Sequence, residues 1–114
     1  MRILLDENLD HAVRKLLVHY DVSTVAYMGW IGQKNDGFLL SAEHNGFDVL
    51  LTGDRGLGNE QNLTGRRIAV VALTAIQTSL IRQHLPRIVS AIDQAVPGTC
   101  QVVDCGRFSR KKRV

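Results

Sequence analysis

Short apolar blocks alternate along the chain with segments in which apolar residues recur at helical spacing. The blocks are typical of buried β-strands, and they lie at residues 3–5, 22–26, 47–52, 68–73 and 99–104. The helical spacing is found at residues 9–20, 38–43 and 80–96. This alternation predicts an α/β domain with a parallel sheet, right-handed crossovers and helices on both faces.

Glycine and proline mark where these elements end. Asn45-Gly46 is a typical helix stop, and Pro86 predicts either a kink or two helices within the long apolar stripe. Residues 27–35 have no clean period and are predicted to form a loop. We expect Trp30 and Ile31 in this loop to fold back on the core, with an exposed contact surface as the alternative.

The length of 114 residues predicts one domain, which we place at residues 1–110, followed by a basic tail at 111–114. No apolar run approaches the ~18 residues that span a membrane. Acids near the start interrupt any signal-peptide pattern, so we expect a cytoplasmic protein. Cys100 and Cys105 have no histidine at zinc-like spacing and are expected to be reduced, partly buried thiols.

The net charge of +3 is unevenly distributed. Without five basic residues near the C-terminus, 9 basic residues stand against 11 acidic ones. A basic terminal segment suits contact with nucleic acid or an acidic partner protein, and a solvated tail is the alternative. Cys105-Gly106 is a candidate turn into an antiparallel edge strand at residues 107–110. The five basic residues are Arg107, Arg110, Lys111, Lys112 and Arg113.

Carboxylates stand where predicted strands end. Asp6 and Glu7 directly follow the first strand. Asp54 follows the third, and Asp36 opens the helix before it. The carboxyl ends of parallel strands share one edge, where open α/β sheets bind ligands, so we expect these acids to converge. Crowded carboxylates repel unless a cation lies among them, and oxygen-only ligands favour Mg²⁺ or Mn²⁺. Helix capping is the alternative for each acid taken alone.

Five motifs occur in a characteristic order: LLDENL, an N-D pair before a helix, VLLTGDRGLG, an IAVVAL strand and an LPRIVSAI helix. Together they resemble the small PIN-like proteins of prokaryotes, a group similar to the PIN-domain toxins of toxin–antitoxin pairs. The resemblance covers about residues 1–110. It implies a three-layer α/β/α sandwich with a mainly parallel PIN-like sheet. It also implies a hydrolase, an endoribonuclease dependent on Mg²⁺ or Mn²⁺, whose partners are RNA and a cognate antitoxin.

The resemblance carries Asp6, Asp36 and Asp54 over as catalytic metal ligands, with Glu7 as a further metal ligand. Water held by such an ion can attack a phosphodiester bond. Side chains beside the acids and in the basic tail are then expected to bind the RNA, because cations neutralise backbone phosphates. These substrate-binding residues are Asn8, Arg55, Arg107, Arg110, Lys111, Lys112 and Arg113.

The chain departs from the family pattern at two places. Relatives usually have a second acid and then an aromatic residue after the T-x-D aspartate, where this chain has Gly56 and Leu57. Acids often follow the position of Asp36, where this chain has Gly37 and Phe38. A site with fewer carboxylates binds metal more weakly. The departures therefore keep open a catalytically weak or inactive PIN-like binding protein.

Two alternatives to a ribonuclease follow. One is that non-catalytic module, with the loop at residues 27–35 as a partner surface. The other is a phosphoacceptor domain like a response-regulator receiver, because Asp6, Glu7, Asp54 and Thr74 fit that outline. The lysine expected after the fifth strand of a receiver is missing, and acids at strand ends are generic to this class of fold. For every one of these functions, a second copy of the chain, in a homodimer, is a candidate partner.

Overall fold

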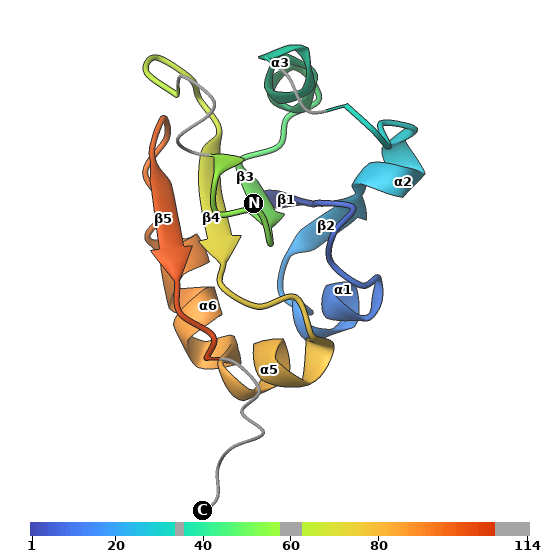
Figure 1. Cartoon of the computed structure of the whole chain (residues 1–114). Helices are drawn as coiled ribbons and strands as arrows, with labels where there is room; N and C mark the ends of the chain where they lie inside the picture. The colour runs from blue at the N-terminus through green and yellow to red at the C-terminus, as the bar shows by residue number, and fades with distance from the viewer. Residues whose placement is uncertain (34–35, 58–62, 107–114) are drawn as a thin grey trace, which may run out of the picture.

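The computed structural model describes residues 1–33, 36–57 and 63–106, except for the side chain of Asp36. Five parallel strands form one sheet in the order β2-β1-β3-β4-β5 (Figure 1). The edge strand predicted at residues 107–110 and the basic tail lie outside the described residues. The strands are β1 (Arg2–Leu5), β2 (Asp21–Thr24), β3 (Val49–Thr52), β4 (Ala69–Leu73) and β5 (Cys100–Val103).

Helices cover both faces of this sheet, which confirms the predicted α/β class and the three-layer α/β/α arrangement. The strands alternate their side chains between two apolar clusters, because successive residues of a strand point to opposite faces. In β1, for example, Leu5 belongs to one cluster and Leu4 to the other. The helices are α1 (Ala12–Leu16), α2 (Val25–Met28), α3 (Asp36–His44), α5 (Thr78–Gln83) and α6 (Leu85–Asp93).

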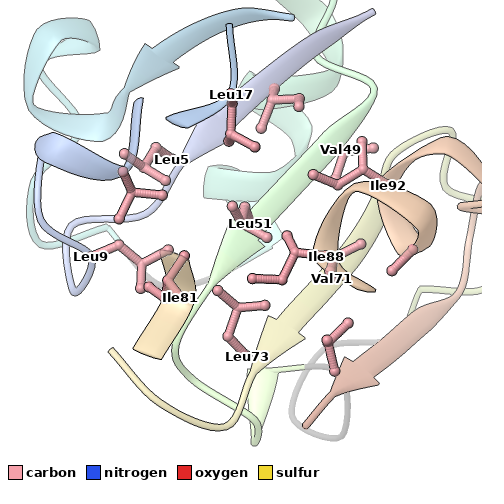
Figure 2. Packing of buried hydrophobic residues seen from close by; sticks show 14 of the residues in the cluster. Leu5, Leu9, Leu17, Val49, Leu51, Val71, Leu73, Ile81, Ile88 and Ile92 are labelled. Carbon is pink, nitrogen blue, oxygen red and sulfur yellow. The ribbon is translucent and has the colours of Figure 1, made fainter. Parts of the chain in front are cut away.

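The larger cluster lies between the sheet and helices α1, α5 and α6. Figure 2 shows its centre, where Leu51 and Val71 of the sheet pack against Ile88 of α6. The smaller cluster lies on the other face, where Phe38 and Leu39 of α3 pack with β-strand residues. No helix in the described part of the chain is long and apolar enough to cross a membrane.

The connections between strands do not all have the same hand. The chain passes from β1 to β2 over the face covered by α1, and from β4 to β5 over that same face through α5 and α6. These two connections run in opposite directions across the sheet, so they have opposite hands. The connection from β2 to β3 runs over the other face through α3 and shares the hand of the first. The prediction that every crossover is right-handed is therefore wrong, and the connection from β4 to β5 is the exception.

The second strand is shorter than predicted. Residues 25–26 belong to α2 and not to β2. The reason is local, because the Thr24 hydroxyl accepts a hydrogen bond of 3.0 Å from the Tyr27 N–H and caps the helix. α2 also takes Tyr27 and Met28 from the predicted loop and ends at Gly29, whose φ is +78°.

The first helix is also shorter than its apolar stripe. The stripe predicts a helix of about three turns from Leu9, but α1 has 5 residues. Leu9 and Leu17 are nevertheless buried, in the turns that flank α1. The Asp10 carboxylate accepts a hydrogen bond of 2.8 Å from the Ala12 N–H and delays the start of the helix. A helical period therefore predicted which face is buried and not how long the helix is.

The later helices and the aromatic loop follow the predictions more closely. Pro86 lies in the first turn of α6, so the long stripe forms two helices. α3 ends at His44, and Gly46 follows with φ +81°, as the Asn45-Gly46 stop predicts. Trp30 packs edge-on against Phe38 and Phe47 of the smaller cluster.

The exposure of the side chains tests the remaining predictions, which concern Trp30, Ile31 and the two cysteines. Ile31 is 65% exposed, so the expectation that it folds onto the core is wrong. Trp30 has the aromatic partners that hold it against the core, whereas its neighbour points outward. Cys100 is half-buried and Cys105 is buried, as the expectation of partly buried thiols has it.

Candidate functional site

Asp6 lies at the centre of the carboxyl edge of the sheet, directly after β1. Its N–H donates a hydrogen bond of 2.9 Å to the Leu51 carbonyl, which extends the pairing of β1 with β3 to this residue. The alternation along β1 places its side chain on the face covered by α3, together with Leu4. β1 and β3 are also the strands between which the strand order reverses, and open α/β sheets bind ligands at such a switch point.

The Asp6 carboxylate is only 3% exposed, and backbone and side-chain donors hold both of its oxygens. Oδ1 accepts a hydrogen bond of 2.8 Å from the Glu7 N–H, and Oδ2 accepts one of 2.7 Å from the Thr52 hydroxyl. Each oxygen of an ionised carboxylate has a second lone pair to offer. The side chain is thus fixed in orientation and retains acceptor capacity.

Thr52 connects the turn after β1 to the turn after β3. Its hydroxyl donates to Asp6 and accepts hydrogen bonds from the Asp54 N–H at 3.0 Å and the Asn8 amide at 3.4 Å. The Asn8 side-chain oxygen in turn accepts a hydrogen bond of 2.9 Å from the Gly53 N–H. The predicted residues Asp6, Asn8 and Asp54 are therefore joined in one network by a residue that sequence reasoning did not single out.

Asp54 joins this network through its backbone N–H, whereas its carboxylate accepts a hydrogen bond within the turn that follows. Oδ1 accepts a hydrogen bond of 2.9 Å from the Gly56 N–H, as in a short aspartate-capped turn. The half-buried side chain thus has the capping role that was the alternative for each acid. Arg55 is exposed beside it and lines a hollow of about 440 Å³ at the ends of β3, β4 and β5.

Glu7 contacts the segment that leads to Asp36 and α3. Glu7 is exposed, and its Oε1 accepts a hydrogen bond of 2.8 Å from the Gly32 N–H, which ties the segment before α3 to the turn after β1. Asp36 is the first residue of α3, and Phe38 in the same turn is buried on the face to which Asp6 points. The backbone of Asp36 therefore begins the helix that covers the Asp6 side of the sheet.

The donor set suits a hard cation bound by few carboxylates. Among the residues that the structure describes, no three His, Cys, Asp or Glu side chains form a group that could hold a metal ion. Mg²⁺ is commonly bound by one or two carboxylates together with water and substrate phosphates. The oriented carboxylate of Asp6 fits that kind of site, and its neighbours Asn8 and Thr52 carry further oxygen atoms.

A second polar cluster lies at the same edge beside β5, and the sequence analysis singled out Thr74 in it but missed Asp104. The Thr74 hydroxyl accepts a hydrogen bond of 2.8 Å from the Cys105 N–H and lies 3.4 Å from the Asp104 carboxylate. The Gly106 N–H above all, and then Thr74 and the charge of Arg87, lower the pKa of Asp104. Asp104 follows a strand as Asp6 does, and that was the signal that could have found it.

Comparison with protein-family models finds no family that matches this chain, and comparisons with curated proteins and with solved structures find no match either.

Proposed function

We propose that this protein is an endoribonuclease that depends on Mg²⁺ or Mn²⁺ and acts at the carboxyl edge of β1 and β3. The observation that carries the proposal is Asp6, a buried and oriented carboxylate at the switch point of the sheet. The hydrogen bonds of Asp6 fix its carboxylate and leave lone pairs for a cation, at the edge where open α/β sheets bind ligands. The motif resemblance of the sequence supports the same reading.

Each residue of the network has a role in this proposal. Asp6 holds the cation, while the Glu7 N–H and the Thr52 hydroxyl keep its carboxylate from rotating. Asp36 or Asp54 supplies a second carboxylate for the cation at the same edge. Asp54 and Glu7 also hold the turns beside it, through the Gly56 and Gly32 N–H groups. The cation, when bound, supplies an activated water and neutralises charge on the phosphodiester. Asn8, Arg55 and the basic tail bind the RNA, since their donors and positive charges suit phosphate oxygens.

The phosphoacceptor alternative has less support. A receiver would turn its threonine toward the aspartate after the third strand, but the Thr74 hydroxyl accepts from the Cys105 N–H. The position after β5 that a lysine would occupy is Asp104. The non-catalytic alternative predicts that the protein does not cleave RNA with either cation, so the cleavage assay described next tests it.

The test is cleavage of a labelled RNA with Mg²⁺, with Mn²⁺ and with EDTA. We expect cleavage with either cation, none in EDTA, and at least a hundredfold loss in Asp6→Asn. Asp36→Asn and Asp54→Asn should each lower the rate. Asp48→Asn is the matched control, because Asp48 is an exposed acid at the opposite edge, where it accepts a hydrogen bond from the Arg2 N–H. Cleavage that persists in EDTA or in Asp6→Asn would rule out this mechanism.

In the cell we propose that the enzyme is the toxin of a toxin–antitoxin pair. Induced expression of the natural chain should stop growth, and expression of Asp6→Asn should not. Co-expression of the product of the neighbouring gene should restore growth if that product is the antitoxin. Equal growth of strains that express the natural chain and Asp6→Asn to the same level would contradict the toxin role without affecting the cleavage assay.

A further inference from the structure

Glu7 forms two hydrogen bonds of equal length, one through its backbone and one through its side chain. Its N–H donates to the Asp6 Oδ1 at 2.8 Å, and its Oε1 accepts a bond of 2.8 Å from the Gly32 N–H. The first bond orients the buried acid of the site, and the second reaches a residue that lies 25 positions further along the chain. Glu7 therefore connects the Asp6 carboxylate to the segment between α2 and α3.

That segment, residues 29–33, leads from α2 toward α3, and we call it the strap (Figure 1). At its start, the N–H groups of Gly29 and Trp30 donate to carbonyls of α2, at 3.1 and 3.0 Å. The Trp30 ring packs on the smaller apolar cluster, whereas Gly32 is exposed. The start of the strap is thus held by α2 and the core, and the bond to Glu7 ties its later part to the carboxyl edge of the sheet.

The backbone of Gly32 has a conformation that favours glycine. Its φ is +89°, in the left-handed region that residues with a Cβ rarely adopt. A Cβ at residue 32 would have no described atom within 4 Å, so the preference for glycine comes from the backbone and not from crowding. A substitution here therefore disturbs the N–H that Glu7 accepts without removing any carboxylate.

The strap precedes Asp36, an acid of the proposed site and the first residue of α3. The first turn of a helix has N–H groups without helical partners, and helix ends fray. Phe38 is buried and holds this turn from the side of the core. The bond between Gly32 and Glu7 holds the chain on the side that enters the helix, and so restricts where Asp36 can lie relative to Asp6.

We propose that Glu7 is a positioning residue, which through its hydrogen bond with the Gly32 N–H holds Asp36 at the cation-binding edge beside Asp6. This inference rests on the proposed ribonuclease function and gives the Glu7 carboxylate a role other than that of a cation ligand. Residues that orient metal ligands from outside the coordination shell typically change metal affinity by about 10–100-fold when they are substituted. An effect of that size is therefore expected from a residue that need not touch the cation.

The first measurement is the backbone order parameter of the strap, from nitrogen-15 NMR relaxation in EDTA so that no cation is bound. Glu7→Ala should lower the order parameters at residues 31–33 from about 0.85, typical of a rigid backbone, to below about 0.6. Glu7→Gln should keep them high, because its amide oxygen also accepts from the Gly32 N–H. Asp10→Ala is the matched control, because Asp10 is an exposed acid that accepts a bond of 2.8 Å from the Ala12 N–H within its own turn.

The second measurement is the affinity for Mn²⁺, from electron paramagnetic resonance of the free ion. Glu7→Ala and Gly32→Ala should each weaken Mn²⁺ binding about tenfold or more. Glu7→Gln should weaken it less than about threefold, because the amide keeps the hydrogen bond in a weaker form. Gly65→Ala is the matched control for Gly32→Ala, because Gly65 has φ +79° and equally open space, in the segment before β4.

A cation ligand at this position would give a different pattern. Glu7→Gln would then weaken Mn²⁺ binding as much as Glu7→Ala does, and Gly32→Ala would leave it unchanged. That pattern would overturn the inference, and so would equal order parameters of the strap in Glu7→Ala and in the natural chain.

The cleavage assay separates this failure from failure of the proposed function. Cleavage that needs Asp6 but tolerates Glu7→Ala and Gly32→Ala rejects the positioning role and keeps the nuclease. A strap and a Mn²⁺ affinity that both depend on Glu7, in a protein that never cleaves RNA, keep the positioning role and reject the nuclease.

Discussion

The Thr52 hydroxyl donates a hydrogen bond of 2.7 Å to the carboxylate of Asp6 between two central strands of the sheet. Among the residues that the structure describes, these two are the buried polar side chains, with exposed fractions of 0% and 3%. Buried polar groups are tolerated when they satisfy one another, and a network of this kind holds its members in fixed orientation. The site is therefore organised around this pair.

Thr52→Val tests the contribution of the hydroxyl. Valine keeps the shape but leaves the buried Asp6 oxygen without its donor and the Asp54 N–H without its acceptor, so we expect unfolding to become about 1–3 kcal/mol easier. Thr52→Ser keeps the hydroxyl and loses one methyl group, at a cost of about 1 kcal/mol. Urea denaturation measures both variants. A Thr52→Val protein as stable as the natural one would show that the network contributes little.

Metal binding at Asp6 should appear as a rise in melting temperature with Mn²⁺. A ligand at a hundred times its Kd stabilises a folded protein by about 2.7 kcal/mol, which shifts the melting temperature by several degrees in a small domain. Differential scanning fluorimetry should show this shift for the natural chain and for Asp48→Asn, and not for Asp6→Asn. An equal shift in Asp6→Asn would place the cation elsewhere on the protein.

Gly53 leaves room for Ile76 above the turn after β3. A Cβ at residue 53 would lie 2.4 Å from the Ile76 Cγ2, so Gly53→Ala forces that side chain to move. We expect Gly53→Ala to destabilise the fold by about 1–3 kcal/mol, the usual cost of overpacking. In a protein that already carries Ile76→Ala, the Cγ2 atom is gone, so adding Gly53→Ala should cost much less stability than it does in the natural chain. Additive effects in the double-mutant cycle would show that the two residues do not interact.

Glu43 makes stability depend on pH in the acid range. Burial by itself raises the pKa of Glu43, but hydrogen bonds from the Arg67 and Ile68 N–H groups and from Arg66 outweigh burial and leave the pKa below its ordinary value. The folded state thus binds this proton less readily than the unfolded state. The stabilisation is complete above the unfolded pKa of about 4.3 and is lost as the pH falls through the lowered folded value.

Glu43→Gln removes this dependence. We expect the variant to be less stable than the natural chain at pH 7, because the neutral amide accepts hydrogen bonds from N–H and guanidinium groups more weakly than a carboxylate does. The difference between the two proteins should shrink as the pH is lowered below about 4.3. Urea titrations from pH 3 to pH 7 measure this difference. A constant gap at every pH would mean that Glu43 keeps its ordinary pKa.

Local patterns in the sequence predicted the elements more reliably than their ends. The strands β3, β4 and β5 lie within the apolar blocks that predicted them. The end of β2 was missed, because the Thr24 cap that starts α2 is a single hydrogen bond within a β-branched run. The carboxylates of Asp6 and Asp54 were predicted to converge. The structure links the two residues only through Thr52 and the Asp54 backbone N–H, and the pattern marked Thr52 only as the end of a strand.

The sequence by itself determined the class of fold, because short apolar blocks alternate along it with segments of helical spacing, and this alternation is typical of α/β domains. It also determined that acids follow β1 and β3. Only the tertiary structure decided that β1 and β3 are neighbours, that the Asp6 carboxylate is held by Thr52, and that the connection from β4 to β5 covers the face of α1. The physical reason is that these features depend on contacts between residues far apart in the chain, for which local spacing has no signal.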